Sequence, residues 1–194
     1  MMDNYTSGGC LFVNGISPDP TDADTLRISL MDAVTYATVS TQIGILKTNG
    51  NVTVTYPPSV PAGSYYIKVI HRNAIQTWSA NAVALSGAST YNFSDLATKA
   101  YGSNMIDVGT ALGEVTPVWA FYSGDISDVN FTGMGLGYQD EIIESQDYLD
   151  MENAVSQILN GYNFEDLTGD GLAESADYVI MENAVSAIRF SVHP

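Results

Sequence analysis

The chain has 194 residues, 22 of them acidic and 6 basic, which gives a formal net charge of −16. This length accommodates two small domains with cores of their own. The acidic balance disfavours nucleic acid as a partner, because nucleic-acid binding needs a basic surface. The single cysteine excludes an internal disulfide framework and a cysteine-rich metal site, and no apolar run is long enough for a membrane span.

Residues 1–9 are polar and are predicted to form an N-terminal arm. They contain no apolar stretch of the kind that a signal peptide has. The adjoining segment at 10–13 is apolar and is predicted as a strand. It is either the ordinary first strand of a sheet or a strand that complements the open sheet of a neighbouring subunit. Cys10 is expected to be a small buried hydrophobic residue.

Residues 10–121 show the two-residue alternation of half-buried strands. Leu26 and Ile28 alternate with polar residues, and so do Val52 and Val54 in a later segment. Turn clusters rich in glycine, proline and asparagine separate such segments. About seven to nine short strands predict a β-sandwich of immunoglobulin-like or transthyretin-like type. The expected strands include residues 26–30, 52–56, 65–70, 75–84, 89–94, 104–108 and 116–121.

Residues 122–194 contain a close internal repeat. ESQDYLDMENAVSQIL at 144–159 and ESADYVIMENAVSAIR at 174–189 are identical at 11 of 16 positions, which indicates one supersecondary unit used twice. Apolar residues recur at helical spacing in both copies, and we expect them to form a shared core rather than a partner surface. These residues are Tyr148, Met151, Val155 and Ile158 in the first copy and Tyr178, Met181, Val185 and Ile188 in the second.

A calcium-binding loop is predicted in front of the second copy. Ca²⁺ takes six to eight oxygen ligands, so its loop must present several carboxylates in a tight arc with a glycine at the sharp turn. The segment 166–177 has acidic or hydroxyl residues at loop positions 1, 3, 5, 9 and 12. Position 7 contributes a backbone carbonyl, and Gly171 stands at position 6. The predicted ligands are Asp166, Thr168, Asp170, Leu172, Glu174 and Asp177.

A second and less regular calcium loop is predicted in front of the first copy. Its ends are separated by an insertion at 128–139, and Glu141 stands where the other loop has its glycine. Loop-closure entropy grows slowly with length, so the insertion is predicted to loop out and leave the ligand ends together. The unbroken loop at 166–177 is expected to bind calcium more tightly. The ligands predicted for this second site are Asp125, Ser127, Asp140, Ile142, Glu144 and Asp147.

The charge distribution fits two calcium sites. Residues 121–194 carry 14 acidic residues against one arginine, or −13, whereas residues 1–120 carry 8 acidic and 5 basic residues, or −3. Calcium neutralises an acidic excess of this kind. Loops of modest affinity need the high calcium concentration found outside cells, so the chain is expected to be secreted and associated with a cell surface.

Paired loop and helix units with Asp at position 12, and with no helix before each loop, resemble dockerin modules. The resemblance covers about residues 122–194 and implies a small α tail made of an EF-type loop-helix pair. In that family, two near-symmetric helices bind a cohesin partner through loop positions 10 and 11. The sequence departs from the family in its long insertion and in Ser127 and Thr168 at position 3, so the resemblance implies calcium more strongly than a cohesin partner. In this sequence, loop positions 10 and 11, which the resemblance assigns to partner recognition, are Ser145, Gln146, Ser175 and Ala176.

A wider resemblance covers most of residues 10–194. PAGSYYIKVIHRNAIQTWSANAVAL at 61–85, followed by TYNFSD at 90–95 and VWAFYSGDI at 118–126, resembles a module of secreted Bacteroidota surface proteins. In those proteins a sandwich immediately precedes a dockerin-like tail. The junction near residue 121 lacks the composition of a linker, so the two domains are expected to pack rigidly.

The sequence offers no pattern of catalytic residues, and the protein is predicted not to be an enzyme. His71 and His193 are the two histidines, and no nucleophile motif, phosphate-binding loop or zinc spacing accompanies them. His71 is expected to be a satisfied structural residue. A glycosidase needs two carboxylates across a cleft, but the dense carboxylates here are assigned to the calcium loops.

Two functions remain open from the sequence. The first is a calcium-stabilised extracellular structural protein that associates with itself or with another surface protein in a filament, adhesin or matrix. The second is a carbohydrate-binding or docking module of a secreted polysaccharide-processing complex, in which aromatic residues stack on sugars. Exposure of Trp78 or Trp119 on one face favours sugar binding, and burial of both excludes it.

Overall fold

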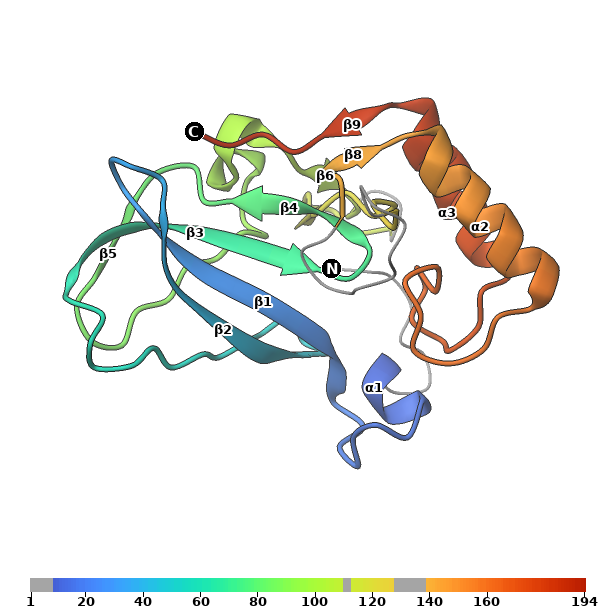
Figure 1. Cartoon of the computed structure of the whole chain (residues 1–194), viewed down its shortest axis with the longest axis horizontal. Helices are drawn as coiled ribbons and strands as arrows, with labels where there is room; N and C mark the ends of the chain where they lie inside the picture. Colours follow the sequence, from blue (N-terminus) through green and yellow to red (C-terminus); the bar gives the residue numbers. More distant parts are fainter. Residues whose placement is uncertain (1–8, 110–112, 128–138) are drawn as a thin grey trace.

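The computed structural model describes residues 9–109, 113–127 and 139–194, and it is mainly β with few helices. Its largest element is an antiparallel sheet with strand order β2-β1-β3-β4, in which β5 also pairs with β3 (Figure 1). The predicted strands at 26–30 and 65–70 are confirmed within this sheet. The strands are β1 (Asp22–Asp32), β2 (Thr38–Lys47), β3 (Gly63–His71), β4 (Ala74–Trp78) and β5 (Val83–Leu85).

One face of this sheet carries an apolar core. Leu26, Ile28 and Val69 are buried there because alternate residues of β1 and β3 point to the same side. The covering layer consists of extended segments that bring Val52, Val54, Phe93 and Phe121 onto the core. Gly44 leaves the space for this layer, since a Cβ there would lie 2.6 Å from the Val52 side chain.

The second layer differs from a regular sheet. The predicted strands at 52–56 and 89–94 are not strands in the structure. Those at 104–108 and 116–121 are reduced to the two-residue pair β6 (Ile106–Asp107) and β7 (Trp119–Ala120). Two 3₁₀ turns, η1 (Ala97–Lys99) and η2 (Tyr101–Ser103), precede this pair. Packing of apolar side chains, rather than a ladder of hydrogen bonds, therefore holds most of this layer to the sheet.

The predicted strand at 10–13 is wrong. Those residues form the one-turn helix α1 (Cys10–Val13), closed by a hydrogen bond from the backbone N–H of Asn14 to the carbonyl oxygen of Cys10. The Asn14 side chain donates to the same carbonyl at 2.9 Å. Cys10 is buried, as expected, and so is Leu11. A helical turn with Cys10 and Leu11 packed inside the chain is not the exchanged strand of the self-association hypothesis. Residues 1–8 of the predicted arm lie outside the described residues.

The C-terminal part contains the helices α2 (Ser145–Gln157) and α3 (Ser175–Ser186) and the strand pair β8 (Ile142–Ile143) and β9 (Arg189–Phe190). The two helices pack side by side (Figure 1). Met151 and Met181 are fully buried between them, together with Leu167 and Ile126.

The predicted helical stripes are core residues for most of their length. Tyr148 and Val155, like their counterparts Tyr178 and Val185, are half-buried against the methionine core. The last members depart from the prediction, since Ile158 and Ile188 are exposed. Both have left-handed backbone conformations, with φ of 50° and 37°, that turn the chain away at the helix ends.

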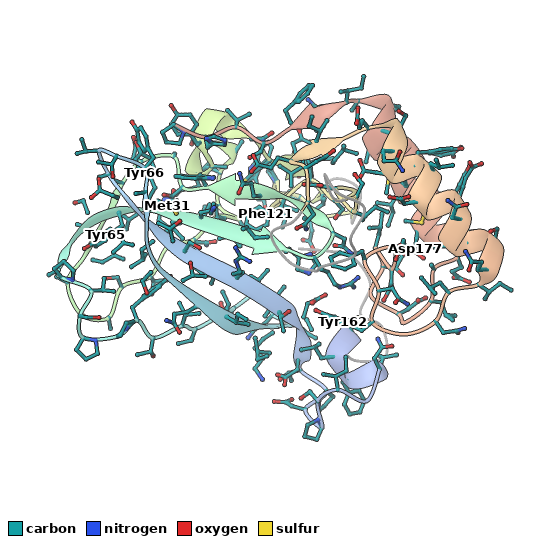
Figure 2. All side chains as sticks on the ribbon, viewed as in Figure 1. Met31, Tyr65, Tyr66, Phe121, Tyr162 and Asp177 are labelled. Atoms are coloured by element: carbon teal, nitrogen blue, oxygen red, sulfur yellow. The ribbon has the colours of Figure 1, made fainter. Side chains whose placement is uncertain are left out.

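The C-terminal part lies directly against the sheet. The Ser191 hydroxyl donates to the carbonyl oxygen of Gln76 at 3.1 Å, and the Asn73 side chain donates to the carbonyl oxygen of Asp166 at 2.9 Å. Figure 2 shows Tyr162 between the start of β1 and the C-terminal loops, where its hydroxyl donates to Asp24. In the described residues, no helix has the length and apolar character that crossing a membrane requires.

Candidate metal centre

The two predicted loops are anchored by the same pair of contacts at position 12. Asp147 and Asp177, each in the first turn of its helix, are fully buried. One oxygen of Asp147 accepts the backbone N–H of Glu144 at 2.8 Å, and the other accepts that of Ser127 at 2.8 Å. Asp177 accepts the equivalent groups of Glu174 at 3.0 Å and Thr168 at 2.7 Å. Positions 3, 9 and 12 therefore have one geometry in both loops.

Positions 5 and 6 extend this equivalence. Asp140 and Asp170 each accept the backbone N–H two residues later at 3.0 Å. Glu141 adopts a left-handed φ of 71°, close to the 89° of Gly171. A glutamate takes this conformation at a cost that glycine avoids. The structure thus brings the two ends of the insertion together as the sequence predicts, although residues 128–138 lie outside the described part of the chain.

Position 1 distinguishes the loops. Asp166 accepts the backbone N–H groups of Gly169 at 2.6 Å, Asp170 at 3.1 Å and Gly171 at 3.1 Å. Asp125 is equally buried, but neither of its carboxylate oxygens has a hydrogen-bond partner among the described residues. The hydroxyl of Ser127 at position 3 is also buried and makes no hydrogen bond of normal geometry there, although it lies near enough to Asp147 to lower the pKa of that carboxyl.

The Asp125 carboxylate therefore lies in an unfavourable electrostatic environment. Burial raises its pKa to about 9, and the neighbouring charges of Asp147, Asp140 and Glu141 act in the same direction, whereas the nearby backbone N–H of Glu141 opposes them without making a hydrogen bond of normal geometry. Burial also raises the pKa of Asp147 and of Asp166. A buried carboxylate without hydrogen bonds is stable only with a proton or a cation beside it.

The predicted ligands differ in exposure. The carboxylates at positions 1 and 12 and the Ser127 hydroxyl are buried, whereas Asp170 and Glu174 are exposed. In the described residues, no group of three or more His, Cys, Asp or Glu side chains is close enough to hold a metal ion by itself. The remaining predicted ligands are half-buried, namely Asp140, Ile142, Glu144, Thr168 and Leu172.

The donor atoms of the two loops are all oxygens. Carboxylates, hydroxyls and backbone carbonyls are the ligands of hard cations such as Ca²⁺, whereas zinc prefers histidine and cysteine. The unpartnered oxygens of Asp125 and Ser127 lie at loop positions 1 and 3, where a calcium loop needs free oxygens. The residues of the first loop therefore fit a calcium ion.

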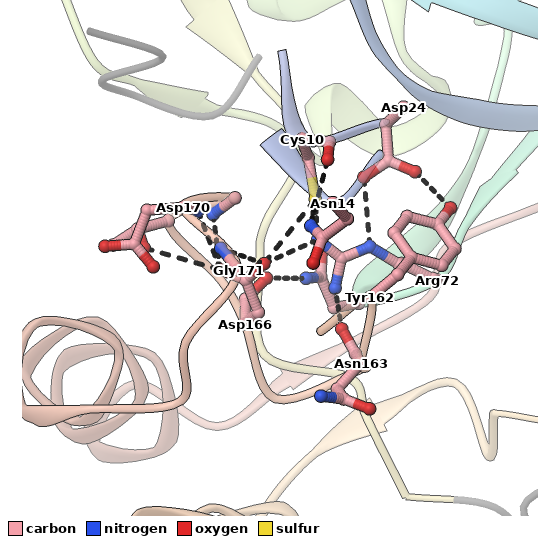
Figure 3. A network of polar contacts seen from close by, with 12 residues as sticks. Cys10, Asn14, Asp24, Arg72, Tyr162, Asn163, Asp166, Asp170 and Gly171 are labelled. Carbon is pink, nitrogen blue, oxygen red and sulfur yellow. Dashed lines mark hydrogen bonds and ion pairs between the residues drawn. The ribbon is translucent and has the colours of Figure 1, made fainter. Parts of the chain in front are cut away.

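A buried polar network beside the second loop was not predicted from the sequence (Figure 3). Arg72, which is 2% exposed, donates to Asp24 at 2.9 Å and lies 3.7 Å from Asp166. It also donates to the backbone carbonyl of Asn163. His71 lies 3.0 Å from the same Asp24 carboxylate, which confirms it as a buried and satisfied histidine. The sequence signal for this network is the polar run His71-Arg72-Asn73 next to an apolar strand.

Opposite charges hold this network together. Burial alone would raise the pKa of Asp24, but His71 and Arg72 lower it below its usual range. The negative charges of Asp24 and Asp166 raise the pKa of Arg72 despite its burial. Cys10 lies 3.5 Å from Asp166, and burial raises the pKa of its thiol to about 12, so the thiol stays protonated.

No protein-family model matches this sequence, and neither does any curated protein. Among solved structures, a chain from an N-terminal interface mutant of a type II cohesin–X-dockerin complex of Acetivibrio cellulolyticus is 17% identical. That match covers 82% of this chain and 80% of the other, with a TM-score of 0.45. A C-terminal interface mutant of that complex matches with 18% identity, the same coverage and the same TM-score. A TM-score at this level does not establish a shared fold, so the function of this chain rests on its own residues.

Proposed function

We propose that residues 122–194 form a calcium-ordered docking module and that the chain is a non-enzymatic component of a secreted protein complex. The observation that carries this proposal is the buried, unpartnered set of oxygens on Asp125 and Ser127. They belong to a loop whose remaining contacts reproduce those of a second loop. Bound calcium would supply the positive charge that these oxygens lack.

The ligands of each loop also position its helix. Asp147 and Asp177 accept the backbone N–H at the start of α2 and α3, and they tie position 3 to the same carboxylate. A cation held at positions 1 and 3 would therefore fix where each helix begins. Calcium binding would in this way order the pair of helices as one surface.

The exposed faces of α2 and α3 carry the same kinds of residue at equivalent positions of the repeat. Leu149 and Val179, which are 30 residues apart, are 48% and 55% exposed. Glu152 and Glu182 are exposed one helical turn further along. Between the helices, the hydroxyls of Tyr148 and Tyr178 contact one another. The outer face therefore offers two matching apolar contacts, each next to a negative charge.

This surface fits a protein partner that has an apolar groove flanked by basic side chains. Charge complementarity favours such a partner, since residues 121–194 carry 14 acidic residues against one arginine. The positions that the dockerin resemblance assigns to recognition lie at the start of the same helices. Of these, Ser145, Ser175 and Ala176 are exposed and Gln146 is half-buried.

The other functional hypotheses have less support. Self-association by strand exchange has no strand to exchange, because residues 10–13 form a helical turn whose Cys10 and Leu11 are buried. Trp78 is only 4% exposed, so it cannot stack on a sugar at the surface. Trp119 is half-buried in β7. The docking part of the carbohydrate-complex hypothesis therefore has the stronger structural basis.

The proposal is tested by affinity capture from the culture medium of the source cells, followed by binding measurements with the purified partner. The wild-type chain should retain a protein in calcium and release it in chelator. The double variant Leu149→Lys/Val179→Lys should lose that binding while keeping calcium affinity and thermal stability. Val34→Lys is the control, because Val34 is an exposed aliphatic residue in the turn after β1. Equal capture by all three proteins, with or without calcium, would reject the docking function.

A further inference from the structure

The second loop already has a positive charge beside its position-1 carboxylate. Arg72 is fixed by its 2.9 Å hydrogen bond to Asp24 and by donation to the carbonyl oxygen of Asn163. From there its guanidinium lies 3.7 Å from Asp166. Two opposite charges at such a distance attract strongly when water is excluded.

The sheet domain also shapes this loop directly. Asn73 donates to the backbone carbonyl of Asp166 at 2.9 Å. A Cβ added to Gly171 would lie 3.1 Å from the side chain of Asn14, so the turn after α1 fits closely against the loop. Asp166 also accepts three backbone N–H groups of its own loop. The loop is therefore fixed by contacts within the chain.

The first loop also contacts the sheet, because Gln139 donates to the carbonyl oxygen of His71 and the Gly124 backbone N–H donates to that of Asn73. Its position-1 carboxylate differs, since Arg27 and Lys68 line the cavity beside it but no ion pair to it is formed within the described residues. The strongest charges that act on Asp125 are the negative ones of Asp147, Asp140 and Glu141. A cavity of about 80 Å³ lies next to its carboxylate, between the loop and the sheet. Its carboxylate oxygens accept no hydrogen bond of normal geometry from the described residues, although the backbone N–H of Glu141 lies near them. The first loop therefore has both the unmet charge and the adjoining space.

We infer that Arg72 is the resident cation of the second loop, so that this loop stays closed without calcium, whereas the first loop closes only when calcium binds. The inference rests on the proposed calcium-ordered module and names how its two sites differ. It reverses the ranking expected from the unbroken sequence of the second loop, because calcium at Asp166 must compete with the guanidinium. The first loop then acts as the calcium-responsive part of the module.

Hydrogen exchange of the full chain, followed by mass spectrometry or NMR, tests this difference. In calcium-free buffer, the amides of Gly169, Asp170 and Gly171 should stay protected, because they donate to Asp166. The amides of Ile126 and Ser127, which donate to Asp147, should exchange at least about tenfold faster than in calcium. Arg72→Met should make the second loop equally calcium-dependent. Lys99→Met removes a positive charge in η1, where Lys99 lies over the Tyr91 ring, and should change neither loop.

The outcomes separate the inference from the proposed function. Equal loss of protection in both loops of the wild-type chain without calcium overturns the resident-cation role but leaves a calcium module. Exchange that does not respond to calcium in either loop overturns both. If Arg72→Met does not fold, the double variant Asp24→Asn/Arg72→Met removes both buried charges. A second loop that stays protected in that variant without calcium also overturns the role of Arg72.

Discussion

At the scale of single residues, Asp125 and Asp166 occupy the same loop position in different surroundings. Asp166 is surrounded by backbone N–H groups and an arginine, whereas both oxygens of Asp125 lack partners in the described part of the chain. The spacing of acidic residues was enough to predict both positions. The difference between them could not be predicted, because it depends on Arg72, which is 94 residues away from Asp166 along the chain.

The raised pKa of Asp125 predicts a pH dependence in calcium-free buffer. Its folded-state pKa of about 9 lies above the ordinary value of 3.8, so the folded state binds this proton more tightly than the unfolded chain does. Stability from this group is therefore complete below about pH 4 and falls as the pH rises toward 9. The thermal midpoint should drop by several degrees between pH 5 and pH 8.

Asp125→Asn is the control for that measurement. The amide removes the titrating group at constant size, so the variant should lose most of the drop, while other groups that titrate in this window are common to both proteins. Asp24, whose pKa is lowered, acts in the opposite direction, but only below its ordinary pKa. A midpoint that rises with pH in the wild-type chain would contradict the assignment.

Glu141 provides a second prediction at this scale. Its φ of 71° is left-handed, and its ion pair with His193 at 3.6 Å is exposed and contributes little. Glu141→Gly should raise the free energy of unfolding by about 0.5–1 kcal/mol, measured by urea denaturation in calcium. Gly171→Ala is the reciprocal variant and should lose about 1–2 kcal/mol. Loss of stability in Glu141→Gly would show that its side chain has another role.

At the scale of elements, the sequence predicted the repeated parts best. The helices α2 and α3 begin and end close to where the two copies place them, because capping residues and apolar spacing agree in both. The short segment at 10–13 was misassigned, since four apolar residues suit a strand or a buried helical turn equally. Tertiary contacts with the second loop determine its helical form.

The extended layer over the sheet also shows what local sequence patterns cannot predict. Val52 and Val54 alternate as predicted and are directed into the core, yet their segment is not assigned as a strand. Alternation reports which side chains are buried, whereas a ladder also needs a neighbouring strand in register. The sequence therefore predicted the buried face of this segment but not its hydrogen bonding.

The helix pair allows a direct comparison of core and surface. Met181 is fully buried and Val179 is 55% exposed on the same helix. Met181→Ala should lower the free energy of unfolding by about 2–5 kcal/mol, because it leaves a cavity between the helices. Val179→Ala should change it by less than about 0.5 kcal/mol. Chemical denaturation in calcium measures both, and similar losses would mean that the outer face is covered within the chain.

At the scale of the whole molecule, the sheet and the C-terminal part form a continuous structure. The network around Arg72 joins β1, the β3-β4 turn and the second loop in one buried cluster. Such contacts span about half of the chain and cannot be found from local patterns. They provide a physical basis for the close packing that the absence of a linker predicts. Both loops contact the sheet, but the position-1 carboxylate of the second loop lies against Arg72, whereas that of the first loop faces a cavity.

Calcium titration calorimetry on the full chain and on Asp125→Asn tests the central claim most directly. The wild-type chain should bind calcium, and the variant should lose the tighter site. In calcium-free buffer, the variant should be more stable than the wild-type chain near pH 8, because its amide folds without the proton uptake that the raised pKa of Asp125 requires. Calcium should raise the thermal midpoint of the wild-type chain and leave that of the variant nearly unchanged. A wild-type chain that gives no binding heat, or the same isotherm in both proteins, would contradict the assignment of Asp125 as a calcium ligand.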